Sequence, residues 1–448
     1  AGNAGAISFV TNSGDISLTN TRLILESRAY TGNSGNGGAL SFATNSGNIL
    51  LTNSRTTAFS SSLSGKGGNG GAISFATNSG NISLLSSSDL DSHTDSGYKS
   101  NGGHGGPIYF TTNSGNITIS SSSSSSSSNS NLGAAGNGGA ISIVTHSGNI
   151  FLEKNTSFSS SFSSNSVSSL GTAANGGEIS VVADSGNIFL DNARLSSYSY
   201  SGSDNSGNGG AIRLSAKSGI IFGDSTLLDS FSVSEGGASR DGGIVTLEAG
   251  KGISGFTINT VASGSKSGEV QINGFGNLLI NQTSILTAQQ VEVCLFPPCS
   301  DPSNPTKKIN LNDRGQAGNV TLNSIGNLTF SNSRIESDTR GGNPAGNIIF
   351  RANQGISIAD NSTISARTSS GGKAGNITFL APTLVVAGDA RVLAETASTG
   401  DSGSIFVNAP TSVDLIRQDN LSPVLSVETS GAGKAGNITI NTLSLSLS

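Results

Sequence analysis

A sequence unit of about 33 residues recurs along the whole chain and limits what the chain can fold into. One copy, Gly67 to Leu84, reads GGNGGAISFATNSGNISL, and close copies lie on both sides of it. One glycine marks the same place in each copy: Gly5, Gly38, Gly71, Gly106, Gly139, Gly177, Gly210, Gly243, Gly268, Gly318, Gly346, Gly375, Gly403 and Gly436. Subtraction gives intervals of 25 to 50 residues, most often 33. A period of this size indicates a solenoid, a propeller or a linear array.

Each copy contains two short segments in which apolar and small residues alternate. Ile73 and Phe75 carry the first alternation, and Ile82 and Leu84 carry the second after a polar turn. A period of two residues is typical of β-strands with one buried face. Equivalent first-segment pairs are Ile7/Phe9, Leu40/Phe42, Ile108/Phe110, Ile141/Ile143, Ile179/Val181, Ile212/Leu214, Val245/Leu247, Ile377/Phe379 and Ile438/Ile440. Equivalent second-segment pairs are Ile16/Leu18, Ile49/Leu51, Ile117/Ile119, Ile150/Leu152, Ile188/Leu190, Leu278/Ile280 and Leu328/Phe330.

A third, weaker segment completes the unit. It appears as Arg22-Leu23, Arg194-Leu195, Arg334-Ile335, Thr363-Ile364 and Arg391-Val392. Three short strands joined by Gly, Asn and Ser corners predict one coil of a three-sided parallel β-helix, since these residues tolerate the bends. A propeller would need four antiparallel strands in each repeat. We therefore predict an all-β chain in which residues 1–448 form one continuous β-solenoid of about 14 coils.

The spacing divides this solenoid into three regions. Residues 1–267 form long coils with Ser- and Gly-rich stretches, which we expect to be loops facing the medium. Residues 268–317 form one coil with a Cys- and Pro-containing insert, and residues 318–448 form shorter, regular coils. The serine run Ser120–Ser128 stands where a third strand belongs. It is either an ordered serine-faced strand or a disordered bulge, because such a run also resembles a linker.

The insert holds the two cysteines of the chain, Cys294 and Cys299, on either side of two prolines. We predict a disulfide that closes this small loop, because the chain has the character of an extracellular protein. The alternative is a redox-active or metal-binding pair. A zinc site would require further Cys or His ligands, which the surrounding sequence lacks.

Charge and composition disfavour two classes of function. The formal net charge is −5 and the pI is about 5.2, whereas nucleic-acid binding needs a basic face. No apolar run approaches the 18 or so residues that a membrane-spanning helix requires. A broken series of arginines is expected to face outward: Arg22, Arg55, Arg194, Arg334 and Arg391. The chain begins within a repeat corner, so we expect any signal peptide to have been removed.

The densest group of metal-binding residue types comprises Asp89, Asp91, His93 and Asp95. Their spacing of two would place them on one side of an extended chain. The order does not match an EF-hand, whose loop needs Gly at position six and Glu at position twelve. We expect a solvated loop, with a calcium or zinc site as the alternative, and assign no metal and no cofactor.

A second titratable set falls at one corner. His146, Asp184 and Lys217 occupy the position that Asn fills in other copies, so successive coils would align them. A sugar-cleaving enzyme would need carboxylates, or a carboxylate with Arg or Lys, converging on one groove. We interpret the set as substitution within an exposed Asn ladder, with catalysis as the alternative, and we assign no catalytic residues.

The repeats GNGGAISFATNSGNISL, NSGNIFL and AGNITF resemble those of filamentous-haemagglutinin-like exoproteins of two-partner secretion, in particular the Gly/Asn/Ser-rich cyanobacterial type. The resemblance implies a right-handed β-helix, export through an outer-membrane partner and an extracellular or cell-surface location. It implies no catalytic residues. We expect a non-enzymatic structural shaft of a surface filament, sheath or adhesin, assembling head to tail with itself. The alternatives are an adhesin fragment that binds surface polysaccharide and a polysaccharide lyase or hydrolase.

Overall fold

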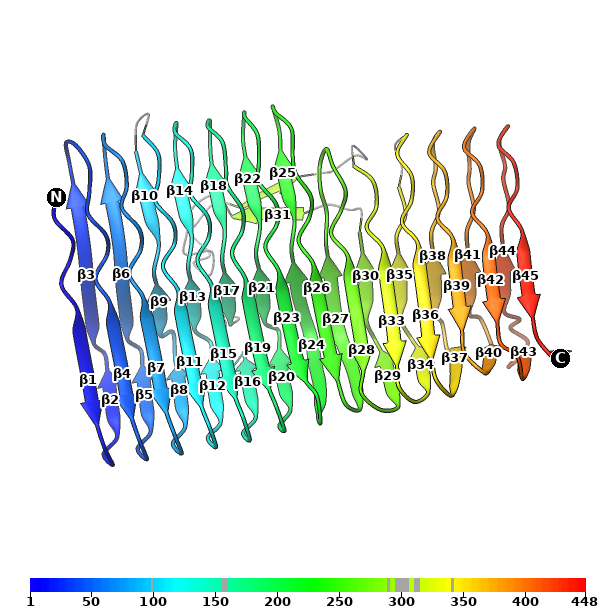
Figure 1. Ribbon diagram of the computed structural model, residues 1–448, viewed down its shortest axis with the longest axis horizontal. Helices are drawn as coiled ribbons and strands as arrows, with labels where there is room; N and C mark the ends of the chain where they lie inside the picture. The colour runs from blue at the N-terminus through cyan, green and yellow to red at the C-terminus, as the bar shows by residue number, and fades with distance from the viewer. Residues whose placement is uncertain (98–99, 155–159, 288–290, 295–305, 310–314, 340–341) are drawn as a thin grey trace.

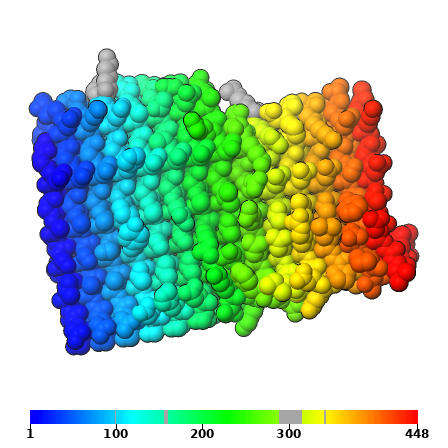
Figure 2. Space-filling view, viewed as in Figure 1, coloured from blue at the N-terminus to red at the C-terminus, as the bar shows by residue number. Residues whose placement is uncertain are grey.

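The protein is a parallel β-solenoid whose coils follow one another from the N-terminal to the C-terminal end (Figure 1). The computed structural model describes residues 1–97, 100–154, 160–287, 291–294, 306–309, 315–339 and 342–448. Within these residues every assigned element is a β-strand or bridge. The space-filling view shows the coils as bands that cross an elongated body (Figure 2). The prediction of an all-β parallel solenoid of about 14 coils is confirmed.

The first strands of the coils form a 14-stranded parallel sheet in chain order. They are β1 (Ile7–Thr11), β4 (Leu40–Thr44), β7 (Ile73–Thr77), β11 (Ile108–Thr112), β15 (Ile141–Thr145), β19 (Ile179–Ala183), β23 (Ile212–Ala216), β26 (Val245–Ala249), β28 (Val270–Gly274), β33 (Val320–Ser324), β36 (Ile348–Ala352), β39 (Ile377–Leu380), β42 (Ile405–Asn408) and β45 (Ile438–Asn441). The marker glycine precedes each strand by two residues, so the sequence repeat and the structural repeat coincide.

The remaining strands of the coils form a 30-stranded parallel sheet. The second strands are β2 (Ile16–Thr19), β5 (Ile49–Thr52), β8 (Ile82–Leu85), β12 (Ile117–Ser120), β16 (Ile150–Glu153), β20 (Ile188–Asp191), β24 (Ile220–Asp229), β27 (Gly252–Asn259), β29 (Leu278–Asn281), β34 (Leu328–Ser331), β37 (Gly355–Ala359), β40 (Thr383–Ala387), β43 (Ser412–Ile416) and β46 (Ser444–Leu447). The third strands are β3 (Arg22–Ala29), β6 (Arg55–Ser62), β9 (Asp89–Asp91), β13 (Ser123–Ser125), β17 (Ser161–Ser163), β21 (Arg194–Ser196), β30 (Ser284–Leu286), β35 (Arg334–Glu336), β38 (Thr363–Ser365), β41 (Arg391–Leu393) and β44 (Val424–Ser426). The long strands β24 and β27 include the third strands of their coils.

The long coils carry a fourth strand, which the three-sided interpretation did not include. These strands are β10 (Thr94–Ser96), β14 (Ser128–Ser130), β18 (Ser166–Ser168), β22 (Ser199–Ser201) and β25 (Ser232–Ser234), and the ends of β3 and β6 pair in the same row. The short coils retain single bridges that link Thr339, Thr368, Thr396 and Thr429. The insert contributes a separate antiparallel pair, β31 (Val291–Cys294) and β32 (Thr306–Ile309).

Aliphatic and aromatic side chains run through the rod in continuous columns. The rings of Phe9, Phe42, Phe75 and Phe110 stack nearly parallel, with centroids 4.8 to 5.1 Å apart. Phe42, Phe75 and Phe110 are completely buried. Equivalent residues pair across neighbouring first strands without a shift of register, as in Ile73 opposite Leu40. Each coil therefore covers the apolar side chains of the next, which one coil could not do alone.

The serine run is ordered and buried. Ser123–Ser125 form β13, and every residue from Ser120 to Ser128 is buried. Ser126 donates a hydrogen bond to the carbonyl oxygen of Gly106, and Ser128 donates to that of Gly103 at 2.7 Å. Of the two alternatives for this run, the ordered serine-faced strand is confirmed. The expectation that the Ser-rich stretches of the long coils are loops facing the medium is wrong here. A serine can be buried here because the glycine-rich part of the coil supplies backbone hydrogen-bonding groups.

The glycine-rich wall opposite these serines approaches its neighbours too closely for a side chain. A Cβ atom added to Gly71 would lie 2.0 Å from the carbonyl oxygen of Gly38 in the preceding coil. A Cβ atom added to Gly106 would lie 2.3 Å from the carbonyl oxygen of Gly71 and 2.3 Å from the hydroxyl oxygen of Ser92. The repeated glycines are therefore a packing requirement of the stacked coils.

Along the rod, the second strands shift once relative to the repeat pattern of the sequence. Ile188 pairs with Ile221, which pairs with Ile253, and Ile253 pairs with Ile280. Ile280 therefore continues the row of Ile188, although the sequence alignment placed it with Leu190. The shift coincides with an irregularity in the pairing of β24 with β27.

Candidate functional site

Among the residues that the structure describes, most ion-paired side chains lie along the third strands and the segments that follow them. Within each coil, residues that alternate with the buried ones along this strand point away from the core, as in Arg334, whose side chain is 56% exposed, beside the buried Ile335. Stacking brings these outward residues into rows that run along the rod. Two places on this surface stand out. In the short coils charged residues line a hollow, and in the long coils a group of charged residues is buried.

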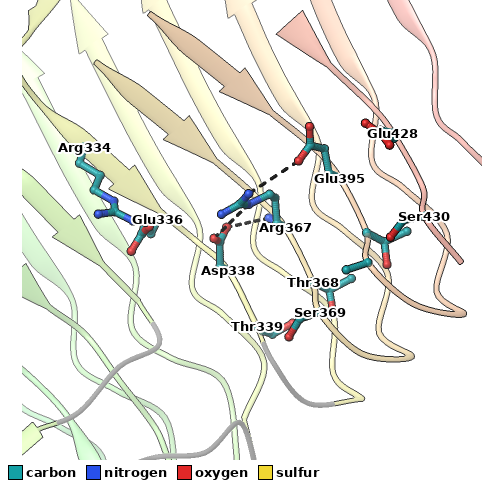
Figure 3. Close-up of a pocket in the computed structure, with 12 residues that line it drawn as sticks. Arg334, Glu336, Asp338, Thr339, Arg367, Thr368, Ser369, Glu395, Glu428 and Ser430 are labelled. Carbon is teal, nitrogen blue, oxygen red and sulfur yellow. Dashed lines mark hydrogen bonds and ion pairs between the residues drawn. The ribbon is translucent and has the colours of Figure 1, made fainter. Parts of the chain in front are cut away.

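In the short coils the rows form a hollow of about 460 Å³, which we call the polar groove (Figure 3). Its lining residues are Arg334, Glu336, Asp338, Thr339, Arg367, Thr368, Ser369, Glu395, Thr396, Ala397, Glu428 and Ser430. Each bridged threonine follows a charged residue, so Asp338, Arg367, Glu395 and Glu428 stand in one row on successive coils. The groove is thus lined by hydroxyl-bearing residues and by charged residues of both signs.

Asp338 is held in place by the next coil. Its carboxylate accepts hydrogen bonds from the hydroxyl of Ser365 at 2.7 and 2.9 Å and from the backbone N–H of Arg367 at 2.7 Å. Burial raises the pKa of Asp338 above its ordinary value, although these hydrogen bonds and the charge of Arg367 act in the opposite direction. Asp338 is therefore a fixed carboxyl group that takes up a proton more readily than an exposed aspartate.

Arg367 links two carboxylates across three coils. Its guanidinium lies 3.6 Å from the carboxylate of Asp338 and 3.7 Å from that of Glu395 (Figure 3). Arg334 and Glu336 form a further ion pair at the edge of the groove, with the Glu336 side chain 8% exposed. Carboxylates and guanidinium groups do converge here, as binding or cleavage of a polar polymer would require.

These groove residues were missed in the sequence, although the repeat contains the signal that finds them. Each lies eight residues before a marker glycine: Asp338 before Gly346, Arg367 before Gly375, Glu395 before Gly403 and Glu428 before Gly436. Aligning the short copies on that glycine would have placed the four charges in one column.

The arginine series predicted from the sequence does occupy one row. Pairing aligns Arg22 with Arg55, Arg194 with Leu227, Arg334 with Thr363, and Thr363 with Arg391. A carboxylate accompanies several members: Asp91 lies 3.9 Å from Arg55, and Asp229 lies 2.9 Å from Arg194. Carboxylates therefore accompany three of the five arginines in this row, with Glu336 beside Arg334.

In the long coils the predicted aspartate and histidine group forms a buried clamp. His93 lies between the ends of β9 and β10; its Nδ1 is 2.7 Å from Asp91 and its Nε2 is 3.0 Å from Asp95. The Asp91 side chain is 3% exposed and that of His93 is 13% exposed. Burial lowers the pKa of His93, but the two carboxylates outweigh it and hold that pKa well above its ordinary value. The expectation of a solvated loop is wrong for Asp91 and His93.

Asp89 takes no part in this clamp. It accepts a hydrogen bond from Ser123 of the next coil, and burial raises its pKa. The His93 ring stacks on Phe59 of the preceding coil at 5.0 Å. Among the described residues no set of three or more His, Cys, Asp or Glu side chains is arranged to hold a metal ion. Asp91, His93 and Asp95 therefore form one ion-paired group, and Asp89 makes a separate contact with the next coil.

The corner set is only partly assembled. His146 and Asp184 meet on successive coils, with Nδ1 of His146 2.8 Å from Asp184, and both side chains are about half exposed. Asn113 and Asn78 make the equivalent contact in earlier coils. The pair therefore continues an asparagine ladder with titratable groups. Cys294 and Cys299 belong to the insert, where the predicted disulfide lies outside the described residues.

Helices long and apolar enough to cross a bilayer are absent from the part of the chain that the structure describes. Comparison with known proteins finds no matching protein family, no matching curated protein and no matching solved structure. The chain is a parallel β-solenoid repeat protein.

Proposed function

We propose that this chain is a non-enzymatic structural shaft, part of a secreted surface filament, sheath or adhesin. The single observation that carries the proposal is the uninterrupted first-strand sheet, in which 14 strands pair in parallel along the entire chain. At a strand spacing of about 4.8 Å such a stack is about 65 Å long. A rod built this way resists bending because every coil is hydrogen-bonded to both neighbours.

We further propose that it is a filamentous-haemagglutinin-like exoprotein exported by two-partner secretion. The Gly/Asn/Ser-rich repeat and the parallel stacking of its coils support this assignment. Export in a cyanobacterial-type host would require an outer-membrane partner. Deleting the gene for a neighbouring outer-membrane transporter should leave the protein inside the cell; unchanged secretion would contradict the proposed route.

Copies of the rod are proposed to stack end to end. The edge strands β1 and β45 expose apolar residues of the core columns: Ile7 is 36% and Ile438 is 42% exposed, whereas Ile73 is fully buried. A coil from a second copy would cover these side chains and pair with the open strand edge. Because the two edges differ, such a contact is head to tail and repeats as a fibre.

Electron microscopy and sedimentation test the shaft and its assembly separately. Isolated protein should appear as straight rods, and raising its concentration should produce longer rods of the same width. A charged substitution at the edge, Ile7→Asp, should keep the single rod but prevent lengthening. Compact or flexible particles would contradict the shaft, and rods that remain single at high concentration would contradict stacking.

A second candidate function is binding of surface polysaccharide in the polar groove. The observation in its favour is the succession of hydroxyl and charged groups across four coils, led by Asp338, Arg367 and Glu395. A glycan array should show binding that Arg367→Ala weakens, with Arg22→Ala on the same face as the control. Release of shortened products from an acidic polysaccharide would instead favour the lyase or hydrolase alternative.

A further inference from the structure

Three successive coils carry a row of phenylalanines on the outer side of the second strands. Phe151 pairs in register with Phe189, and Phe189 with Phe222. The first two rings stack at 5.2 Å with planes 8° apart, and Phe222 is 46% exposed. The row is bounded by Thr118 on one side and Ser254 on the other. The apolar surface is therefore confined to three coils.

A row of carboxylates runs beside the phenylalanines. Glu153, Asp191 and Asp224 each follow a phenylalanine by two residues, so they share its outward face. Asp191 pairs in register with Asp224, and both are exposed. We call the three phenylalanines and three carboxylates the Phe/acid ladder; its strands β16, β20 and β24 are neighbours in the sheet (Figure 1).

The charges of this ladder have no cationic partner in the described part of the chain, although Asp224 accepts a hydrogen bond of 3.1 Å from the hydroxyl of Ser225. Glu153, Asp191 and Asp224 are absent from its ion pairs, in contrast to the carboxylates beside Arg194 and Arg367. Like charges on neighbouring strands repel each other, and an exposed aromatic row leaves apolar surface in water. One partner that is both cationic and apolar would relieve both costs.

We propose that the Phe/acid ladder is a docking site for an extended basic peptide segment in which an apolar residue and a Lys or Arg stand two positions apart. Residues two apart on a strand lie about 6.6 to 7 Å apart on one face. That spacing equals the distance from the phenylalanine row to the carboxylate row. Asp224 also borders a shallow hollow of about 600 Å³, which gives the partner's side chains room beside the ladder.

Other ligand classes fit these residues less well. Nucleic acid would be repelled by the carboxylates. A metal ion would leave the phenylalanine row uncovered, and the described residues contain no metal-binding arrangement. A neutral sugar would leave the three charges unpaired. The inference concerns a different face from the polar groove and does not depend on the proposed function.

A labelled synthetic peptide tests the site directly. The probe contains three copies of Val-Thr-Lys-Thr, and its binding to the full chain is measured by fluorescence anisotropy at low and high salt. Two comparison peptides replace every Lys with Glu or every Val with Ser. We expect the probe to bind at least tenfold more tightly than either comparison peptide, with affinity falling as salt increases.

Variants of the rod identify the face that binds. Phe189→Ser and Asp191→Asn should each weaken binding at least fivefold while thermal unfolding stays close to that of the unaltered chain. Phe406→Ser, at an exposed residue of the first-strand sheet, and Asp360→Asn, at an exposed corner, are the matched controls and should bind normally. Equal binding of the Glu peptide, or binding unaffected by both ladder variants, would overturn the proposal.

Discussion

The long coils and the short coils share one apolar core but fill the rest of their cross-section differently. In both regions the first strand buries an apolar pair, as in Ile73 and Phe75 or Ile377 and Phe379. The long coils then add a fourth strand whose inward side chains are serines and threonines, whereas the short coils keep one bridged threonine. Extra coil length is therefore filled largely by hydroxyl groups bonded to backbone. In the later long coils it also holds a small second apolar cluster of Val167, Tyr198, Tyr200, Phe231, Val233 and Val261.

Hydrogen bonding makes this second kind of interior possible. Ser128 donates to the carbonyl of Gly103 at 2.7 Å and accepts from the N–H of Gly136 at 2.8 Å. Ser60 does the same with Gly35 and Gly68 two repeats earlier in the row. Each serine thus satisfies two backbone groups of a wall that has no side chains of its own. The layer that the fourth strands add is thin because the segment opposite them is rich in glycine.

The largest expected effect tests whether the apolar core is equivalent in the two regions. Phe75→Ala and Phe379→Ala should each destabilise the protein by about 3 to 5 kcal/mol, because each removes a fully or almost fully buried ring and leaves a cavity. Chemical denaturation measures the free energy of unfolding. A cost in one region less than half that in the other would show that the two cores do not contribute alike.

The second-largest expected effect is a loss of stability that should differ between the long coils and the short coils. Ser128→Ala leaves the Gly103 carbonyl and the Gly136 N–H without a partner and should cost about 2 to 3 kcal/mol. Thr368→Val in the short coils should cost less than about 1 kcal/mol, since Thr368 accepts one long bond of 3.4 Å from Ser370 and valine keeps its shape. Equal costs would contradict the idea that only long coils depend on buried hydroxyl groups.

The sequence predicts the shared part of the coils and not the added part, for a physical reason. The apolar pairs of the first two strands alternate at constant distances from a glycine, so pattern alone locates them. Serines such as Ser126 and Ser128 have the composition of a linker, and their burial depends on backbone partners supplied by a distant segment. Contacts between coils, such as Asp338 with Arg367, appear only when residues one repeat apart are compared.

The His93 clamp offers a smaller effect, confined to the long coils. Its pKa is raised in the folded protein, so its contribution to stability is complete below the ordinary histidine value near 6.5 and is lost as pH rises through the folded value. Unfolding measured from pH 6 upward should show this loss, and His93→Gln should remove it. A pH dependence that persists in that variant would assign the titration to another group.

The smallest expected effect is the pH dependence of stability that Asp338 causes in the short coils, which corresponds to that of His93 in the long coils. Burial raises the pKa of Asp338, so the folded state holds a proton more tightly than the unfolded chain, and stability increases as pH falls from the folded value toward the ordinary value of about 3.8. Asp338→Asn should flatten this acid limb by a fraction of a kcal/mol, because the group lies at a groove open to water. His93→Gln should leave the same limb unchanged. The long-coil and short-coil regions would then respond to pH in separate windows, because one response comes from a histidine whose pKa is raised and the other from a carboxyl group. If Asp338→Asn altered stability at neutral pH and not at acidic pH, the carboxylate would instead act mainly through its bonds to Ser365 and Arg367.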